Sequence, residues 1–236
     1  MTQTHVFNSA RGALIATLLI VALGAMSFFV FEPSIGHSQI TDEFTVSQTI
    51  TNEISFNVTA TDVTMTGAIA GLTGGYATGT TVVSVNTNNV TGYNMKLHFA
   101  TNTVAHAMVA SSTDPSSAYI GNYTPAVAGV PDYTWVDNAS GQSAEFGYTV
   151  TGTTPGEVDP SFMNNTSSCN AGTNETANRC WLNPTTTPET IINSTASNSN
   201  STTTLTFKVA VPNAPSPALP SGVYIATGTL TATTNP

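Results

Sequence analysis

Alternation of hydrophobic and polar residues is the strongest pattern in this chain. Between Tyr93 and Phe99 the two kinds alternate without a break, and the run from Leu205 to Val211 repeats the pattern. Because successive side chains of a strand point to opposite faces of its sheet, this period of two predicts half-buried strands. The same period recurs in shorter runs at Phe44–Val46, Ile54–Val58, Val63–Met65, Val83–Val85, Phe146–Val150 and Tyr224–Thr233.

Turn residues separate these runs and complete the prediction of the fold class. Residues 88–92, which include two asparagines and a glycine, separate the runs at 83–85 and 93–99 and predict a hairpin. A glycine-rich stretch at 71–75 marks a further turn. About eight or nine strands with one polar face each, joined by such turns, are typical of an antiparallel β-sandwich. We therefore predict an all-β fold of this kind, preceded by an N-terminal apolar helix.

The N-terminal region contains a long hydrophobic run that predicts export. Arg11 precedes nineteen uncharged residues, Ala13–Phe31, and small residues follow up to Ser38. This arrangement suits a signal peptide cleaved near Ser38, and the length of the run also suits an uncleaved membrane anchor with Arg11 inside. A prepilin leader cut after Gly12 is a third alternative, although Thr17 stands where such leaders generally carry glutamate. Cleavage and retention both stay open.

The chain divides into an export segment, residues 1–38, and one folded domain, residues 39–236. Within that domain, residues 152–202 are rich in Asn, Thr, Ser and Pro and predict a loop-rich excursion. Cys169 and Cys180 lie in this excursion with ten residues between them. A lone pair of cysteines in an oxidising compartment most often forms a disulfide. We therefore predict a disulfide that closes the excursion.

The scarcity of charge limits the classes of partner. Charged residues make up 7% of the chain, and the formal net charge is −9. After Ser38 the only cations are Lys96, Arg179 and Lys208. Nucleic acids and anionic lipids are bound by clusters of cations that meet their phosphates. We therefore exclude both classes, and we expect contact with a membrane only through residues 13–31 if these are retained.

The sequence contains no pattern of catalytic residues, and we predict no catalytic, cofactor-binding or metal-binding residue. His98 lies on the polar face of a predicted strand, where a solvent-facing role is expected. Glu157 and Asp159 lie in a turn-like stretch and would suit a glycosidase pair or a calcium ion, although a solvated loop is the more ordinary interpretation. Calcium is the one cofactor that these oxygens suggest. Trp135 is the residue that we single out for contact with a glycan, although packing is the commoner role of such a side chain.

Three stretches resemble secreted proteins of candidate-phyla (Parcubacteria-like) bacteria. They are Phe44–Phe56, Val85–Tyr93 and the closing Ser221–Pro236. The resemblance implies an exported, β-rich surface protein and does not imply an activity. The C-terminal stretch also resembles the WxL cell-wall-binding domains. That family carries Trp-x-Leu motifs, whereas Trp181 and Leu182 are adjacent here, so wall binding is not carried over.

These observations favour a non-enzymatic protein of the cell surface or the extracellular space, as a component of an envelope layer, a fibre or an adhesin. Its expected partners are cell-envelope components or further copies of itself. Scarce charge removes the usual protection of sheet edges, so we expect strand addition between copies, with residues 39–50 as the donated strand. A carbohydrate-binding module is the alternative from another class, and a secreted hydrolase is the third.

Overall fold

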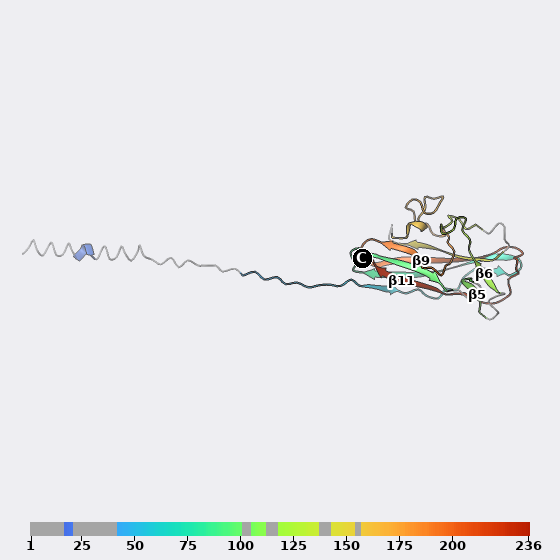
Figure 1. Ribbon diagram of the computed structural model, residues 1–236, viewed down its shortest axis with the longest axis horizontal. Helices are drawn as coiled ribbons and strands as arrows, with labels where there is room; N and C mark the ends of the chain where they lie inside the picture. The colour runs from blue at the N-terminus through green and yellow to red at the C-terminus, as the bar shows by residue number, and fades with distance from the viewer. Residues whose placement is uncertain (1–16, 21–41, 101–104, 112–117, 137–142, 154–156) are drawn as a thin grey trace, which may run out of the picture. The chain divides into compact units, whose positions relative to one another are not determined.

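The computed structural model describes residues 17–20, 42–100, 105–111, 118–136, 143–153 and 157–236. Contacts between residues divide the chain into two units, Met1–Thr49 and Ile50–Pro236. The second unit is rich in β-structure, with eleven strands and one short 3₁₀ helix, η1 (Pro160–Phe162), among its described residues (Figure 1). The prediction of a β-rich fold is therefore confirmed.

The larger of two sheets is built around two long strands, β3 (Gly74–Thr87) and β9 (Asn198–Val211). They pair antiparallel from Gly75 opposite Val211 to Thr87 opposite Asn198, with one register shift. The order of the sheet is β1-β3-β9-β7-β6-β5-β10, and β2 also pairs with β3. The bounds of its other strands are Ile54–Val58 (β1), Ile69–Ala70 (β2), Met108–Ala110 (β5), Tyr119–Asn122 (β6), Glu145–Gly152 (β7) and Tyr224–Ala226 (β10).

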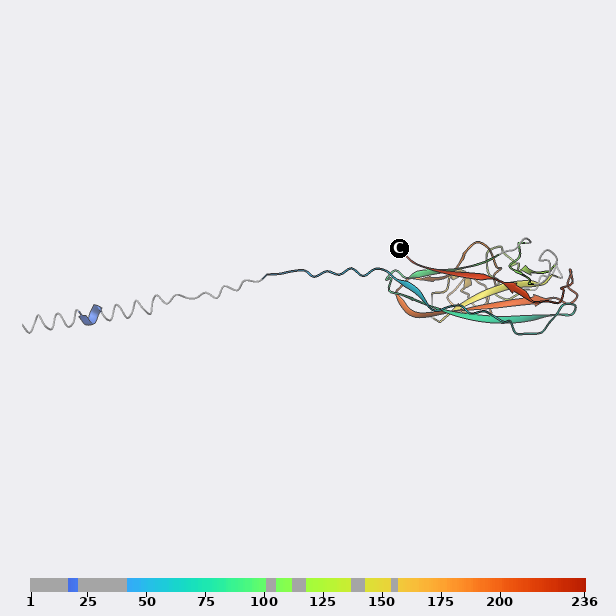
Figure 2. The same cartoon turned by 90° about the horizontal axis from the view of Figure 1, so that it is seen from below.

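The smaller sheet has three strands in the order β11 (Gly228–Thr234), β4 (Tyr93–Phe99) and β8 (Glu189–Ser194). Only Thr227 separates β10 from β11, so the chain passes from one sheet to the other at this residue. The run that we predicted at Tyr224–Thr233 is therefore divided between the two sheets. In Figure 2 the red β11 and the blue-green β3 lie on opposite sides of the unit.

Side chains from both sheets share one hydrophobic core. Each strand contributes alternate residues: in β4 every second residue from Tyr93 to Phe99 is buried, while Lys96 between them is exposed. The ring of Phe99 lies 5.7 Å from that of Phe146 and 5.6 Å from that of Tyr148, both on β7. Burial of each such side chain stabilises the fold by about 1.5–3 kcal/mol. The hydrophobic alternation in the sequence is thus explained by packing between the sheets.

The hairpin that we predicted at residues 88–92 is wrong. The flanking strands β3 and β4 belong to different sheets and do not pair with each other. Val83 and Tyr93 both face the core, so the two strands oppose each other through their side chains. Gly92 has a φ of +83°, and a Cβ here would collide with the carbonyl oxygen of Ser194. This glycine permits the turn because it alone adopts that conformation at low cost.

The prediction of a purely antiparallel arrangement is also wrong, because β6 and β7 pair in parallel through Gly121–Glu145 and Asn122–Phe146. Parallel neighbours need a crossover of a dozen or more residues, and residues 123–144 supply one. Neither Phe44–Val46 nor Val63–Met65 forms a strand. Met65 is instead partly buried against the core without regular pairing.

The predicted N-terminal helix is not supported by the described residues. Within Ala13–Phe31 only residues 17–20 are described, and they form one helical turn. The rest of that run, and the other residues of the predicted export segment, lie outside the described part of the chain. Among the described residues, no helix is both long and apolar enough to cross a bilayer.

Candidate functional site

An aromatic cluster surrounds Trp135, the residue predicted to contact a glycan. The ring of Tyr123 lies 4.2 Å from the Trp135 ring, and Trp181 meets it edge-on at 5.4 Å. The Lys208 ammonium lies 4.7 Å from the centre of the same ring. A Cβ on Gly147 would come within 2.9 Å of Trp135, so this indole packs directly over the backbone of β7. Trp135 is therefore enclosed on several sides, which favours a packing role.

Tyr76 extends this cluster toward solvent. Tyr76 is 66% exposed, and the centre of its ring lies 5.6 Å from the Lys208 ammonium. On the far side, Tyr123 donates a 2.6 Å hydrogen bond to the Asp132 carboxylate. Burial, together with this bond, raises the pKa of the Tyr123 hydroxyl. Tyr76 and Lys208 are thus the members of the cluster that a ligand would meet first.

Glu157, the first carboxylate of the predicted pair, is buried at 8% exposure, and both of its oxygens accept hydrogen bonds. Its Oε1 accepts bonds from Ser194 Oγ at 3.1 Å and Asn198 Nδ2 at 2.8 Å, and its Oε2 accepts one from Ser201 Oγ. These three donors come from the end of β8 and the start of β9. The carboxylate therefore links the end of β8 in one sheet to the start of β9 in the other.

Asp159 faces a different set of groups. Its Oδ1 accepts hydrogen bonds from the backbone N–H and the hydroxyl of Ser161, and so caps η1. The pair is thus not assembled into one site. Among the described residues, no three His, Cys, Asp or Glu side chains are grouped so that they could hold a metal ion.

The described contacts do not join His98 or His106 to Glu157 or Asp159; the two histidines have other neighbours. His98 pairs with Thr229 on the polar face of β4, as its position in the alternation predicts. His106 stacks on Tyr119, with ring centres 4.0 Å apart, and burial lowers the pKa of its imidazole. Neither histidine is brought to a nucleophile by the described contacts.

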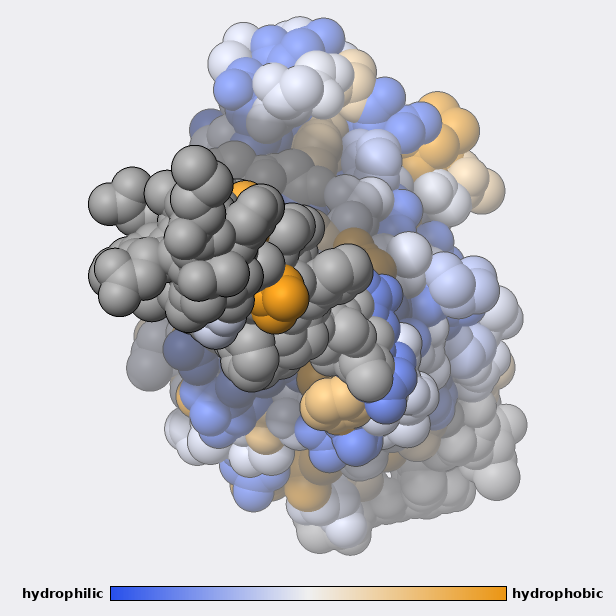
Figure 3. Space-filling model, turned by 90° about the vertical axis from the view of Figure 1, so that its left-hand side faces the viewer, coloured by the Kyte–Doolittle hydropathy of each residue, from blue (hydrophilic) through white to orange (hydrophobic). Residues whose placement is uncertain are grey.

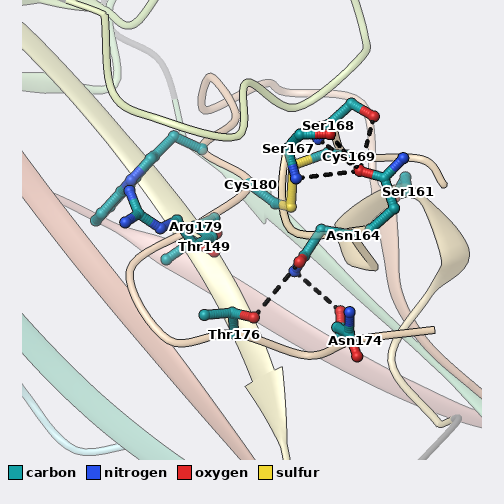
Figure 4. The surroundings of a disulfide bond; sticks show 12 residues. Thr149, Ser161, Asn164, Ser167, Ser168, Cys169, Asn174, Thr176, Arg179 and Cys180 are labelled. Atoms are coloured by element: carbon teal, nitrogen blue, oxygen red, sulfur yellow. Dashed lines mark hydrogen bonds between the residues drawn. A yellow bond between two sulfur atoms is a disulfide. The ribbon is translucent and has the colours of Figure 1, made fainter. Parts of the chain in front are cut away.

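The predicted disulfide between Cys169 and Cys180 is confirmed. Both cysteines belong to the core, and Cys180 is completely buried. Asn164, also completely buried, organises the loop that they close. Its Nδ2 donates to the Asn174 carbonyl at 2.9 Å, and its Oδ1 accepts from Thr176 (Figure 4). The loop is therefore a cross-linked structural element.

The edge strand β11 is the most unusual surface feature. It pairs with β4 over seven residues without a register shift. Ala100 N–H donates to the Thr227 carbonyl and Asn235 N–H donates to the Gly92 carbonyl, so odd-numbered residues bond with β4. In an antiparallel pair the intervening residues turn their backbone groups the other way. Gly228, Leu230, Ala232 and Thr234 therefore direct their N–H and C=O groups to the free edge.

Natural proteins usually guard such an edge with charge, proline or a bulge. β11 contains neither a charged residue nor a proline. Beside it, edge strand β1 contacts β11 and is likewise uncharged. Ile54, Phe56, Leu230 and Ala232 of these strands are only partly buried against the core, and Val58 is 45% exposed. Elsewhere, in the view of Figure 3, hydrophobic residues are scattered among hydrophilic and neutral ones.

No family model, curated protein or solved structure matches the chain. The resemblances carried by its motifs therefore stay predictions. Sequence inspection missed the free edge of β11, since pairing partners are not visible in a single strand. The absence of charge from residues 228–234 was the signal that could have identified it.

Proposed function

We propose that this protein is a non-enzymatic structural component of a cell surface or an extracellular layer or fibre, in which copies associate through their sheet edges. Export through the N-terminal hydrophobic run is part of this proposal. The single observation that carries it is the regular, uncharged free edge of β11. An edge of this kind is a ready template for another chain.

The proposal is tested by imaging the full chain in a mild non-ionic detergent, which keeps residues 13–31 from driving association. We expect ordered filaments or layers in negative-stain electron micrographs. Thr229→Lys places a charge at the exposed outer face of β11 and is expected to disperse them. Thr173→Lys makes the same change at an exposed position of the disulfide loop and should leave them intact. A wild-type protein that stays monomeric at all concentrations would contradict the proposal.

A second candidate function, carbohydrate binding, is favoured by one observation. Tyr76 offers an exposed aromatic face beside Lys208, and partly exposed rings of this kind suit stacking on a sugar. A glycan array with the wild-type protein should then show binding that Tyr76→Ala and Trp135→Ala both abolish. Tyr119→Ala, in the stack with His106, is the matched control. A wild-type protein that binds none of the glycans removes this candidate.

A further inference from the structure

We propose that residues 44–50 of one copy add as a strand to the free edge of β11 in a second copy. This inference rests on the proposed function and names the contact through which copies would associate. It joins two features of the described residues: an amphipathic segment outside any sheet, and a sheet edge to which no further strand is hydrogen-bonded.

The donated segment has the pattern of a strand but forms none. Phe44, Val46 and Ile50 alternate with polar residues, and they are 86%, 82% and 81% exposed. Ile54 and Phe56 of β1 also stand at even-numbered positions, and both pack against the core. An amphipathic strand pattern therefore continues beyond the N-terminal end of β1. Transfer of such apolar side chains from water into a protein interface is favourable and would stabilise an assembly.

The acceptor follows from a comparison of the edges. β10 has only three residues, and β1 is interrupted by a register shift between Phe56 and Val58. The outer edge of β8 is occupied, because Asp159 N–H donates to the Ile191 carbonyl and Asn193 N–H donates to the Glu157 carbonyl. Among the strands that the structure describes, only β11 combines seven residues, regular pairing and a side without a hydrogen-bonded neighbour.

The acceptor is assigned to a second copy because the residues just before β1, Thr51 to Glu53, are held by hydrogen bonds to Asn88. The Asn88 side chain acts like a neighbouring strand: its Nδ2 donates to the Thr51 carbonyl at 3.0 Å and its Oδ1 accepts from Glu53 N–H at 2.7 Å. A return of Phe44 along the same molecule's β11 would require a reversal at these residues. That reversal would break both hydrogen bonds.

The first test is a cysteine cross-link between two differently labelled preparations of the full chain in mild detergent. One carries Thr45→Cys, and the other carries Thr229→Cys, Thr231→Cys or Thr233→Cys. The odd-numbered residues of β11 form their backbone hydrogen bonds with β4. Opposite an antiparallel donor strand they would therefore form non-hydrogen-bonded pairs, in which the two Cα atoms lie about 4.5 Å apart. Disulfides span this distance. Together the three acceptors cover alternative registers and both strand directions.

We expect a disulfide-linked dimer with at least one acceptor, in clear excess over the control Thr173→Cys. No excess with any of the three acceptors would overturn the proposal. A variant with the donor and the acceptor cysteine in one chain would also overturn the proposal if it formed only the intramolecular disulfide. The native disulfide is a poor competitor in exchange because Cys180 is completely buried.

The second test compares two triple variants of the donated segment. Phe44→Asn, Val46→Asn and Ile50→Asn remove its apolar face and should raise the concentration for half-assembly by about tenfold or more. Thr45→Asn, Ser47→Asn and Thr49→Asn change the other face and should leave that concentration within about threefold. All six residues are exposed, so the fold should persist in both variants, as checked by near-ultraviolet circular dichroism.

The outcomes separate the two proposals. Assembly that survives loss of the apolar face contradicts strand donation and leaves edge association standing. A wild-type protein that never assembles contradicts the proposed function, and the donated strand with it.

Discussion

At the scale of single residues, Glu157 shows how one buried carboxylate joins separate parts of the chain. It accepts hydrogen bonds from the side chains of Asn198 and Ser201. Glu157→Gln would turn an amide N–H₂ toward these donors. Because serine hydroxyls can rotate to accept, we expect a partial loss of about 1–3 kcal/mol in the free energy of unfolding.

Urea denaturation measures this loss, and the matched control is Asp62→Asn, which makes the same charge change at an exposed site. The control should stay within about 0.5 kcal/mol of wild type. Equal stabilities of the two variants would show that the Glu157 contacts contribute nothing.

The buried tyrosines predict alkaline destabilisation. Burial raises the pKa of Tyr148, and burial with the bond to Asp132 raises that of Tyr123, above the value of about 10 for an unfolded tyrosine. Between the unfolded and the folded pKa the native state holds protons that the unfolded state has lost. Stability is therefore complete below pH of about 10 and falls as the pH rises above it, by up to about 1.4 kcal/mol per pH unit for each tyrosine.

Tyr148→Phe should make this decline shallower, measured as the thermal midpoint between neutral and alkaline pH. Tyr76→Phe changes an exposed ring and serves as the control. A decline of the same steepness in both variants would mean that Tyr148 is not responsible.

At the scale of elements, the disulfide loop predicts a measurable contribution to stability. The cross-link joins residues eleven positions apart. Chain-entropy arguments give about 3 kcal/mol for a loop of this size. The double variant Cys169→Ala with Cys180→Ala should unfold at correspondingly lower urea, and reductant should lower the midpoint of wild type but not that of the double variant. Equal midpoints of wild type and double variant would contradict this account.

The strands could be predicted from the sequence wherever one face is buried. The run at Tyr93–Phe99 is reproduced as β4 because every second residue enters the core. The run at Phe44–Val46 has the same alternation, yet it forms no strand. Alternation shows that a segment is amphipathic, but it does not show which other segment buries the apolar face.

Pairing between strands could not be predicted for a related reason. The turn at 88–92 is compatible with a hairpin or with a passage between sheets, and the choice depends on contacts with distant residues. Asn235 settles it here: its Nδ2 donates to the Thr91 and Ser194 carbonyls, tying the end of β11 to the turn. The predicted disulfide needed no such information, because two cysteines allow one pairing.

At the scale of the whole molecule, sparse charge and free edges lead to the same expectation. Charged residues make up 7% of the chain, and none lies on β1 or β11, so these edges carry no charge that would repel a second copy. Two of its three cations after Ser38 lie over aromatic rings, Lys208 over Trp135 and Arg179 over Tyr133. Neither is therefore available as an edge guard. This composition is compatible with the association between copies that we propose.

Amide hydrogen exchange of residues 228–234 tests the central claim most directly. The exchange is measured on the full chain at concentrations below and above the one at which the protein assembles. In the monomer, Leu230 and Ala232 turn their N–H groups to the free edge and should exchange rapidly. The account predicts strong protection of these amides on assembly, together with those of residues 44–50. Assembly with unchanged exchange along β11 would contradict it.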